Sequence, residues 1–240
     1  MPDPHHHLRV DAKLGPLHLS AKMTLSVPWT ILFGPSGSGK SSILRAACGF
    51  IHPADVDFAQ SIPGGWNELQ TTHHSIPPHR RNLAYAPQGA ILFPHLSVRE
   101  NIAFASTARN QPANTQLIHT AINLFDLAPL ANRLPRDLSG GERQRANLAR
   151  AFAVPSPHLL LLDEPFTGIG RALRDTLLPR MKHHAAQHGI PVLSVTHDVE
   201  EALLLNAEVI RLDTGRIIAQ GPAADILAAE RTSMLAILQS

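Results

Sequence analysis

The sequence has little of several features that mark secreted or membrane-spanning proteins. It contains one cysteine, Cys48, so no disulfide can form within the chain, and this favours a reducing compartment. No run reaches the roughly 18 apolar residues of a transmembrane helix, and residues 1–7 lack the basic-then-apolar order of a signal peptide. We therefore expect the chain to stay inside the cell and to serve any membrane from its surface, through a partner.

The chain also lacks a strong charge of either sign. Its 21 basic and 19 acidic residues give a formal net charge of +2, and no basic run is longer than Arg80-Arg81, so nothing indicates nucleic-acid binding. The consecutive histidines 5–7 cannot all face one ion and have no acidic or cysteine partner nearby. We expect a solvated N-terminal segment there rather than a metal site.

Several segments of the sequence have the residue patterns of strands in a mixed sheet. Residues 8–25 partly alternate in polarity, which predicts antiparallel strands at a sheet edge. Residues 82–86 predict a further strand, and residues 159–163 and 191–197 are apolar on both faces, as central parallel strands are. Residues 209–219 predict a closing hairpin.

A helical region interrupts this pattern between residues 91 and about 154. Ser97 can cap a helix that follows it, and after Pro112 the apolar residues recur at helical spacing up to Phe125. At 240 residues, the chain suits one large domain or a core with an inserted subdomain, and this region is the candidate insertion.

The strongest local motif is residues 34–41, which read GPSGSGKS. This G-x-x-x-x-G-K-[ST] pattern follows a short apolar run at 30–33 and precedes a helical stretch, as a phosphate-binding loop requires. Its glycines let successive N–H groups point at phosphates, Lys40 supplies a mobile charge, and the Ser41 hydroxyl can ligate Mg²⁺. The predicted nucleotide-binding residues here are Gly34, Pro35, Ser36, Gly37, Ser38, Gly39, Lys40, Ser41 and Ser42.

Two carboxylates follow the leucine run at 159–162. Asp163, at the end of a buried strand, can hold Mg²⁺ opposite Ser41, and Glu164 can polarise an attacking water, the positioning role that phosphoryl transfer needs. The alternative is a solvated acidic turn, which strand ends often have. The complete phosphate loop upstream favours the catalytic interpretation.

A third motif, LSGGERQR, occupies residues 138–145. Ser139 and Glu142 can form a capping box at the start of a helix. That alternative does not explain Gly140 and Gly141 in the first turn, where each glycine costs about 1 kcal/mol relative to alanine. Glycines there suit a backbone that must approach something closely, and a helix N-terminus suits an anion.

In this order the motifs resemble those of the ATP-binding cassette (ABC) family over residues 8–221. The resemblance implies an α/β fold: a P-loop NTPase core with a mainly parallel sheet, an N-terminal antiparallel β portion and an inserted helical subdomain. The core would comprise residues 1–90 and 155–240, and the subdomain about 91–154. The cofactors would be ATP and Mg²⁺.

The resemblance also implies roles for single residues. Glu164, His197 and Gln88 would be catalytic, with His197 contacting the γ-phosphate and Gln88 sensing Mg²⁺ and the attacking water. The implied metal-binding residues are Ser41, Gln88 and Asp163. Ser139, Gly140 and Gly141 would contact an ATP held by a second copy, in a head-to-tail dimer, and a monomer would hydrolyse poorly.

Two segments depart from the family pattern. Gly170 stands where the family has an aspartate in the loop that couples the two sites, which puts coupling in question. Leu17 and His18 stand where an aromatic residue stacks on adenine, and hydrophobic contact by Leu17 would leave base selectivity relaxed.

The resemblance to importers is carried by residues 89–102, around the groove that receives a permease, and by Pro77-Pro78-His79-Arg80-Arg81. Residues 14–17 resemble the molybdate branch, so molybdate or a related ion is the candidate solute, and we expect no C-terminal ligand-binding domain. The implied partners are a membrane permease and an extracytoplasmic solute-binding protein, with no nucleic acid, at the cytoplasmic face of the cell membrane.

Two alternatives remain from the sequence. One is a non-transport ABC ATPase that acts on soluble nucleoprotein partners, although the second cassette or coiled-coil insertion of such proteins is missing. The other is a weakly hydrolysing regulatory subunit, suggested by Gly170 and opposed by the intact Lys40, Asp163, Glu164 and His197.

Overall fold

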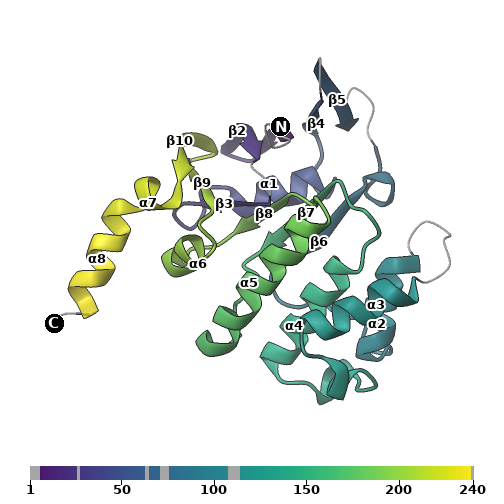
Figure 1. Ribbon diagram of the computed structural model, residues 1–240. Helices are drawn as coiled ribbons and strands as arrows, with labels where there is room; N and C mark the ends of the chain where they lie inside the picture. Colours follow the sequence, from purple (N-terminus) through teal and green to yellow (C-terminus); the bar gives the residue numbers. More distant parts are fainter. Residues whose placement is uncertain (1–5, 26–27, 63–64, 71–75, 108–113, 239–240) are drawn as a thin grey trace.

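The computed structural model describes residues 6–25, 28–62, 65–70, 76–107 and 114–238, and within these ranges ten strands form one sheet (Figure 1). The strands are β1 (His6–Leu14), β2 (Leu17–Leu25), β3 (Trp29–Phe33), β4 (Ala54–Ile62), β5 (Gly65–Gln70), β6 (Leu83–Ala86), β7 (Leu159–Asp163), β8 (Val192–Val195), β9 (Glu208–Asp213) and β10 (Arg216–Pro222). Their spatial order is β5-β4-β1-β2-β10-β9-β3-β8-β7-β6. From β9 to β6 all neighbours run parallel, and the other half is mostly antiparallel, which confirms the expected α/β class.

The hairpin of β1 and β2 lies inside the sheet, so its prediction as an edge was wrong. β1 pairs along its length with β4, in a register that sets His6 opposite Gln60, and β5 then forms the edge. Val56 and Phe58 of β4 are buried beneath this pairing. A contact between segments some fifty residues apart leaves no local signal, and the prolines around β4 obscured its alternation.

The helices cover both faces of the sheet. They are α1 (Lys40–Ala47), α2 (Val98–Thr107), α3 (Thr115–Leu124), α4 (Gly140–Phe152), α5 (Arg171–Gln187), α6 (Val199–Leu204), α7 (Ala223–Ile226) and α8 (Ala228–Leu238). Figure 1 shows α2, α3 and α4 gathered beyond β6, and α8 at the opposite end of the molecule. Short 3₁₀ turns at 78–80, 128–130 and 135–137 join the elements.

Strand β7 shows how the two faces differ. Leu159 and Leu161 pack into a core with α1, β1 and β2, whereas Leu160 and Leu162 pack into a second core with α4 and α5. Because side chains alternate along a strand, a run of four leucines supplies both cores at once. The strand therefore ends with Asp163 on the same face as α1.

The structure also bears on the N-terminal histidines, on Cys48 and on membrane-spanning helices. His6 is buried and stacks on Phe58 with ring centroids 5.5 Å apart, so it is not solvated, and His5 lies outside the described residues. Cys48 is buried as expected, and burial raises the pKa of its thiol to about 12. In the described part of the chain, we find no helix with the length and apolar character needed to cross a membrane.

Candidate functional site

The phosphate loop joins β3 to α1 and its conformation depends on glycine. Gly37 and Gly39 have φ of 80° and 103°, in the left-handed region that other residues avoid. A Cβ on Gly39 would lie 2.4 Å from Leu19 Cδ2, and one on Gly34 would lie 2.1 Å from the carbonyl oxygen of Leu212. The loop is therefore packed against β2 and β9 with no room for side chains at these positions.

The polar groups of the loop are arranged to receive an anion. Lys40 folds back so that Nζ donates to the carbonyl oxygens of Gly34 and Pro35, both at 2.8 Å, and burial lowers the pKa of Lys40. The Ser38 hydroxyl is buried and has no hydrogen-bond partner in the described structure. An ammonium group, an unsatisfied hydroxyl and a helix N-terminus in one loop suit a phosphate group.

The loop meets β7 through the metal-ligand candidates. Ser41 Oγ donates to Asp163 Oδ1 at 2.8 Å, and Tyr85 on β6 donates to Oδ2 at 3.4 Å. Asp163 is only 3% exposed, and burial raises its pKa. A hydroxyl and a carboxylate that converge beside a phosphate loop are the hard oxygen ligands that Mg²⁺ prefers, so these residues fit that ion. No group of three or more His, Cys, Asp or Glu side chains suited to a metal occurs in the described ranges.

Glu164 is the centre of a second cluster. Gln88 Nε2 donates to Glu164 Oε2 at 2.8 Å, Thr167 Oγ1 donates to the same oxygen at 3.2 Å, and His197 Nδ1 lies 3.4 Å from Oε1. Gln144 Nε2 donates to the carbonyl oxygen of Pro165 at 2.9 Å and braces the turn. The fold thus brings together the three predicted catalytic residues Glu164, Gln88 and His197, and the amide nitrogen of Gln88 faces Glu164.

The backbone at Glu164 is strained. Its φ is 46°, a left-handed conformation that is uncommon outside glycine and costs of order 1 kcal/mol or more. The conformation is fixed by the hydrogen bond from the Glu164 N–H to the carbonyl oxygen of Val195 at 3.0 Å. A glutamate held at this cost beside a buried aspartate is typical of a functional site.

The start of α4 is a complete capping box. The Glu142 N–H donates to Ser139 Oγ at 3.3 Å, and the Ser139 N–H donates to Glu142 Oε2 at 2.7 Å. The two glycines differ in their surroundings: a Cβ on Gly141 would lie 2.8 Å from the carbonyl oxygen of Gly168, whereas a Cβ on Gly140 would meet no atom within 4 Å. The lack of a side chain at Gly141 is thus explained by a contact within the chain, whereas at Gly140 no atom of the described chain excludes a side chain.

Segment 139–141 is not joined to the phosphate loop by any hydrogen bond among the described residues. The described structure thus does not join Ser139, Gly140 and Gly141 to the other predicted nucleotide-binding residues through hydrogen bonds. Gly170 is the residue before α5, with a φ of −62° and no side-chain cap.

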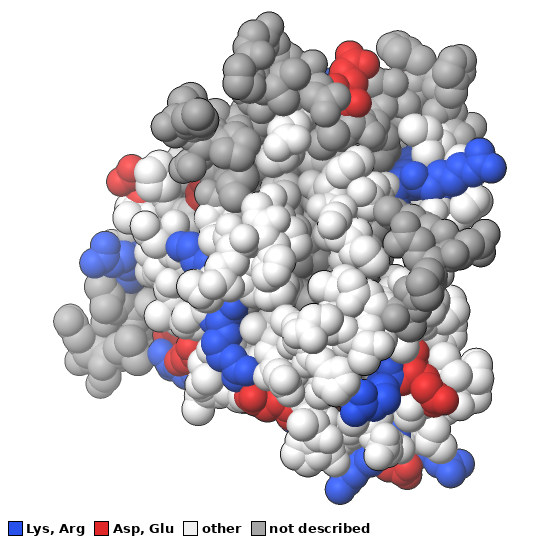
Figure 2. Space-filling view, turned by 45° about the vertical axis from the view of Figure 1, so that its right-hand side comes forward, with Lys and Arg blue, Asp and Glu red and all other residues white. Residues whose placement is uncertain are grey.

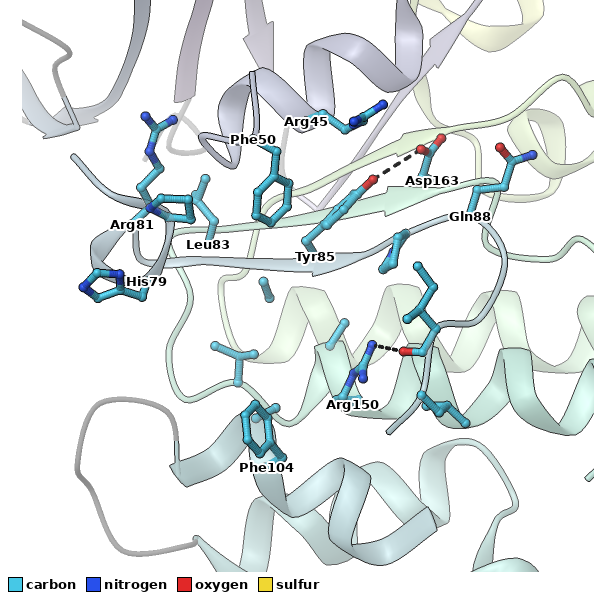
Figure 3. A pocket seen from close by; sticks show the side chains of 18 of the residues that line it. Arg45, Phe50, His79, Arg81, Leu83, Tyr85, Gln88, Phe104, Arg150 and Asp163 are labelled. Atoms are coloured by element: carbon cyan, nitrogen blue, oxygen red, sulfur yellow. Dashed lines mark hydrogen bonds between the residues drawn. The ribbon is translucent and has the colours of Figure 1, made fainter. Parts of the chain in front are cut away.

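A groove runs from Asp163 and Gln88 to helices α2 and α4 (Figure 3). It encloses about 840 Å³, and the polar side chains of Ser41, Gln88 and Asp163 are among those that line it. The exposed apolar side chains of Phe50, Ile91 and Phe104 also line it. Arg45 and Arg150 add positive charge, and Arg150 donates to the carbonyl oxygen of Ile91 at 2.6 Å. On the face shown in Figure 2, charges of both signs are scattered over a mostly uncharged surface.

Sequence reasoning missed Tyr85, Thr167 and Gln144 as site residues. Gln144 stood in the LSGGERQR motif and Thr167 three residues after Glu164, so their proximity could be suspected but their contacts could not. Tyr85 offered a clearer signal, because its position in a predicted strand sets the face of the sheet on which it lies.

Comparison with known proteins gives one family and many relatives. The ABC transporter family matches residues 23–167. The molybdenum import ATP-binding protein of Rhizobium etli is 36% identical over 240 residues, which are 97% of this chain and 66% of that protein. The molybdate/tungstate import ATP-binding protein of Archaeoglobus fulgidus is 31% identical, with 97% of this chain and 93% of that protein covered.

Other relatives are longer than this chain. The Fe(3+) ions import ATP-binding protein of Pseudomonas fluorescens is 36% identical, with 82% of this chain and 55% of that protein covered. The chain spans between 54% and 66% of the length of the molybdenum and iron relatives. A solved dimeric ATP-binding cassette, in a post-hydrolysis state bound to ADP and Pi, matches with a TM-score of 0.73 and 21% identity over 91% of this chain and 98% of that one, which establishes the fold.

Proposed function

This chain belongs to the ABC transporter family, and from that premise we propose that it is the ATP-hydrolysing subunit of an importer that takes up an ion through a separate permease. The observation that carries the proposal is the 2.8 Å hydrogen bond between Ser41 and Asp163, which joins a phosphate loop to a buried carboxylate. The relatives named as import proteins support the transport part of this proposal, and none of them supports the alternative of soluble nucleoprotein partners.

The binding step uses the loop residues. The backbone N–H groups of residues 36–42 and the Lys40 ammonium hold the β- and γ-phosphates of ATP, and the buried Ser38 hydroxyl gains the partner that it lacks. Ser41 and Asp163 would hold Mg²⁺ through their hydroxyl and carboxylate oxygens. The chemistry that Mg²⁺ would supply there is neutralisation of charge on the transferred phosphoryl group.

The hydrolytic step uses the cluster around Glu164. Its carboxylate orients the attacking water, and Gln88, Thr167 and His197 fix that carboxylate from three sides. The side chain of His197 is 74% exposed, so it would be accessible to the γ-phosphate of a bound ATP. Positioning of this kind supplies most of the catalysis in phosphoryl transfer.

A second copy completes the site. Ser139, Gly140 and Gly141 would contact an ATP on the phosphate loop of the other copy, because the N-terminus of α4 offers free N–H groups and Gly140 leaves its approach open. The molecule would then divide into a core of residues 1–90 and 155–240 and a helical subdomain of about 91–154, with the sites between two cores. Gly170 would leave the coupling between these sites without its usual carboxylate.

The groove would receive a cytoplasmic helix of the permease. Its apolar side chains and the charges of Arg45 and Arg150 favour a helix with an apolar face and an acidic residue. The complex would sit at the cytoplasmic face of the cell membrane with an extracytoplasmic solute-binding protein. Molybdate or a related oxyanion is the proposed solute, from the names of the relatives.

Cross-linking from the groove tests the transport proposal. Cys48 is buried and its pKa is raised to about 12, so a cysteine introduced at Ile91 would be the reactive thiol. Ile91→Cys protein should cross-link a multi-span permease in native membranes, whereas Ile218→Cys, equally exposed on β10, should not. Cross-linking of only soluble proteins from Ile91→Cys would refute the transport role and leave ATP hydrolysis to be judged separately.

A further inference from the structure

Tyr85 is the only tyrosine of the chain, and its hydroxyl group points at a metal-ligand candidate. The hydroxyl donates to Asp163 Oδ2 at 3.4 Å, across the boundary between β6 and β7 (Figure 3). No other role in the proposed reaction requires this side chain. Its contact with Asp163 therefore needs its own explanation.

The register of the two strands produces this contact. In the parallel pair, Tyr85 lies beside Leu161, and Asp163 is two residues further along β7. Side chains two residues apart point to the same face of a strand, so Tyr85 and Asp163 share one face. The tyrosine ring is long enough to bring its hydroxyl from the level of Leu161 to that of the carboxylate.

Asp163 is consequently held through both of its oxygens. Ser41 Oγ bonds Oδ1 at 2.8 Å, and Tyr85 bonds Oδ2 at 3.4 Å. Two donors on opposite oxygens fix the rotation of the carboxylate plane, which one donor cannot do. Groups that orient a metal-binding carboxylate in this way affect metal affinity without contacting the metal.

The ring of Tyr85 faces a different feature. It forms part of the wall of the 840 Å³ groove and lies 6.0 Å, between centroids, from the ring of Phe50. Phe50 is 53% exposed in that groove. In Figure 3, Tyr85 lies between Phe50 and Asp163, whereas Phe104 lies away from both, across the groove.

We propose that Tyr85 is a positioning residue that connects the wall of the groove to Asp163, so that a change at Phe50 alters Mg²⁺ binding. The inference rests on the proposed function, since it needs Asp163 to hold Mg²⁺. The side chain of Tyr85 on β6 would thus connect the groove directly to the proposed metal site.

Three variants separate this link from general damage. Tyr85→Phe removes the hydroxyl and keeps the ring. Phe50→Leu removes the ring that contacts Tyr85. Phe104→Leu is the matched control, because Phe104 is 52% exposed in the same groove but pairs with Phe93 instead, at 4.6 Å between centroids.

Two readouts are measured on the full chain with the non-hydrolysable analogue AMP-PNP. The first is analogue binding at a series of free Mg²⁺ concentrations. The second is the NMR signal of ¹³Cζ-labelled tyrosine, which arises from Tyr85 alone because the chain has one tyrosine. The NMR experiment on unsubstituted protein keeps the proposal testable even if Tyr85→Phe folds poorly.

Tyr85→Phe should raise the free Mg²⁺ needed for half-saturation by about tenfold, at the low end of the effect of such orienting groups because the hydrogen bond is long. Affinity for the analogue without Mg²⁺ should not change. Phe50→Leu should shift the tyrosine signal and raise the Mg²⁺ requirement, and Phe104→Leu should do neither. In the unsubstituted protein, Mg²⁺ should shift the tyrosine signal of the analogue complex.

The proposal is overturned if Mg²⁺ leaves the tyrosine signal unmoved, if Tyr85→Phe keeps the normal Mg²⁺ requirement, or if Phe50→Leu and Phe104→Leu behave alike. Failure of the proposed function would look different. In that case the chain would not bind AMP-PNP, or Lys40→Ala would bind it equally well, and the role of Tyr85 would fall with it.

Discussion

Alanine at Gly140 and at Gly141 should have opposite effects on stability, although the two positions are adjacent at the start of α4. A Cβ at position 141 would lie 2.8 Å from the carbonyl oxygen of Gly168, a backbone atom that cannot turn away. A Cβ at position 140 would meet nothing within 4 Å. The pair therefore separates a glycine required by the chain's own packing from one that the fold does not require.

The magnitudes follow from two terms. Alanine favours a helix over glycine by up to about 1 kcal/mol, and both variants gain this term. Only Gly141→Ala forces α4 away from the loop at Gly168, and overpacking of this kind costs about 1–3 kcal/mol. We expect the two variants to differ by about 2 kcal/mol, which is about 4–8 °C in Tm for a chain of this size.

Thermal and urea unfolding of the two variants beside the unsubstituted protein measures the difference. Gly140→Ala should equal or exceed the stability of the unsubstituted protein and Gly141→Ala should fall below it. If Gly140 is the position that admits a nucleotide from a second copy, Gly140→Ala should also lose ATP-dependent dimerisation while it remains stable. Equal stabilities, or a more stable Gly141→Ala, would refute the packing argument.

Three further predictions concern pH, packing and base recognition. Burial raises the pKa of Glu201 to about 7 from an ordinary 4.5. The stability that the protonated side chain contributes is therefore complete below pH 4.5 and is lost as the pH rises through 7. Glu201→Gln should remove this loss, worth roughly 3 kcal/mol, in urea unfolding measured from pH 5 to 8. Arg81 donates to two carbonyl oxygens at the end of α1, so Arg81→Met should lower the free energy of unfolding by about 3 kcal/mol, and a cost below 1 kcal/mol would contradict this role. Leu17 packs beside Gly39. In competition against labelled ATP, Leu17→Tyr should tighten ATP binding by about tenfold, because the ring can stack on the base, while inorganic triphosphate binds as before. A large preference for ATP over triphosphate in the unsubstituted protein would contradict the expectation that base recognition is weak.

The contiguous motifs predicted much of the site because each carries its own geometry. The phosphate loop needs only the local order of strand, glycines and helix. Ser41, at the start of α1, meets Asp163 because the loop after β3 and the end of β7 lie at the carboxyl edge of the same parallel sheet. The closing hairpin of β9 and β10 was confirmed for a similar reason, since its turn and both strands lie within fifteen residues.

The remaining features depend on contacts between distant segments. The interior position of β1 follows from its pairing with β4, and α5 was not predicted as a helix because Pro179 interrupts its apolar spacing. The packing of Gly141 against Gly168 and the contact of Tyr85 with Asp163 depend on the placement of whole elements. Local sequence patterns contain no information about such distances.

ATP-driven dimerisation of Glu164→Gln protein requires the phosphate loop, the proposed metal-binding residues and the start of α4 to act together. Sedimentation with Mg²⁺ and either ATP or ADP, with Lys40→Ala as control, measures it. We expect a dimer that holds two ATP molecules, formed with ATP alone and absent with ADP or in Lys40→Ala. A Glu164→Gln protein that stays monomeric at saturating ATP, or that dimerises equally well without nucleotide, would contradict it.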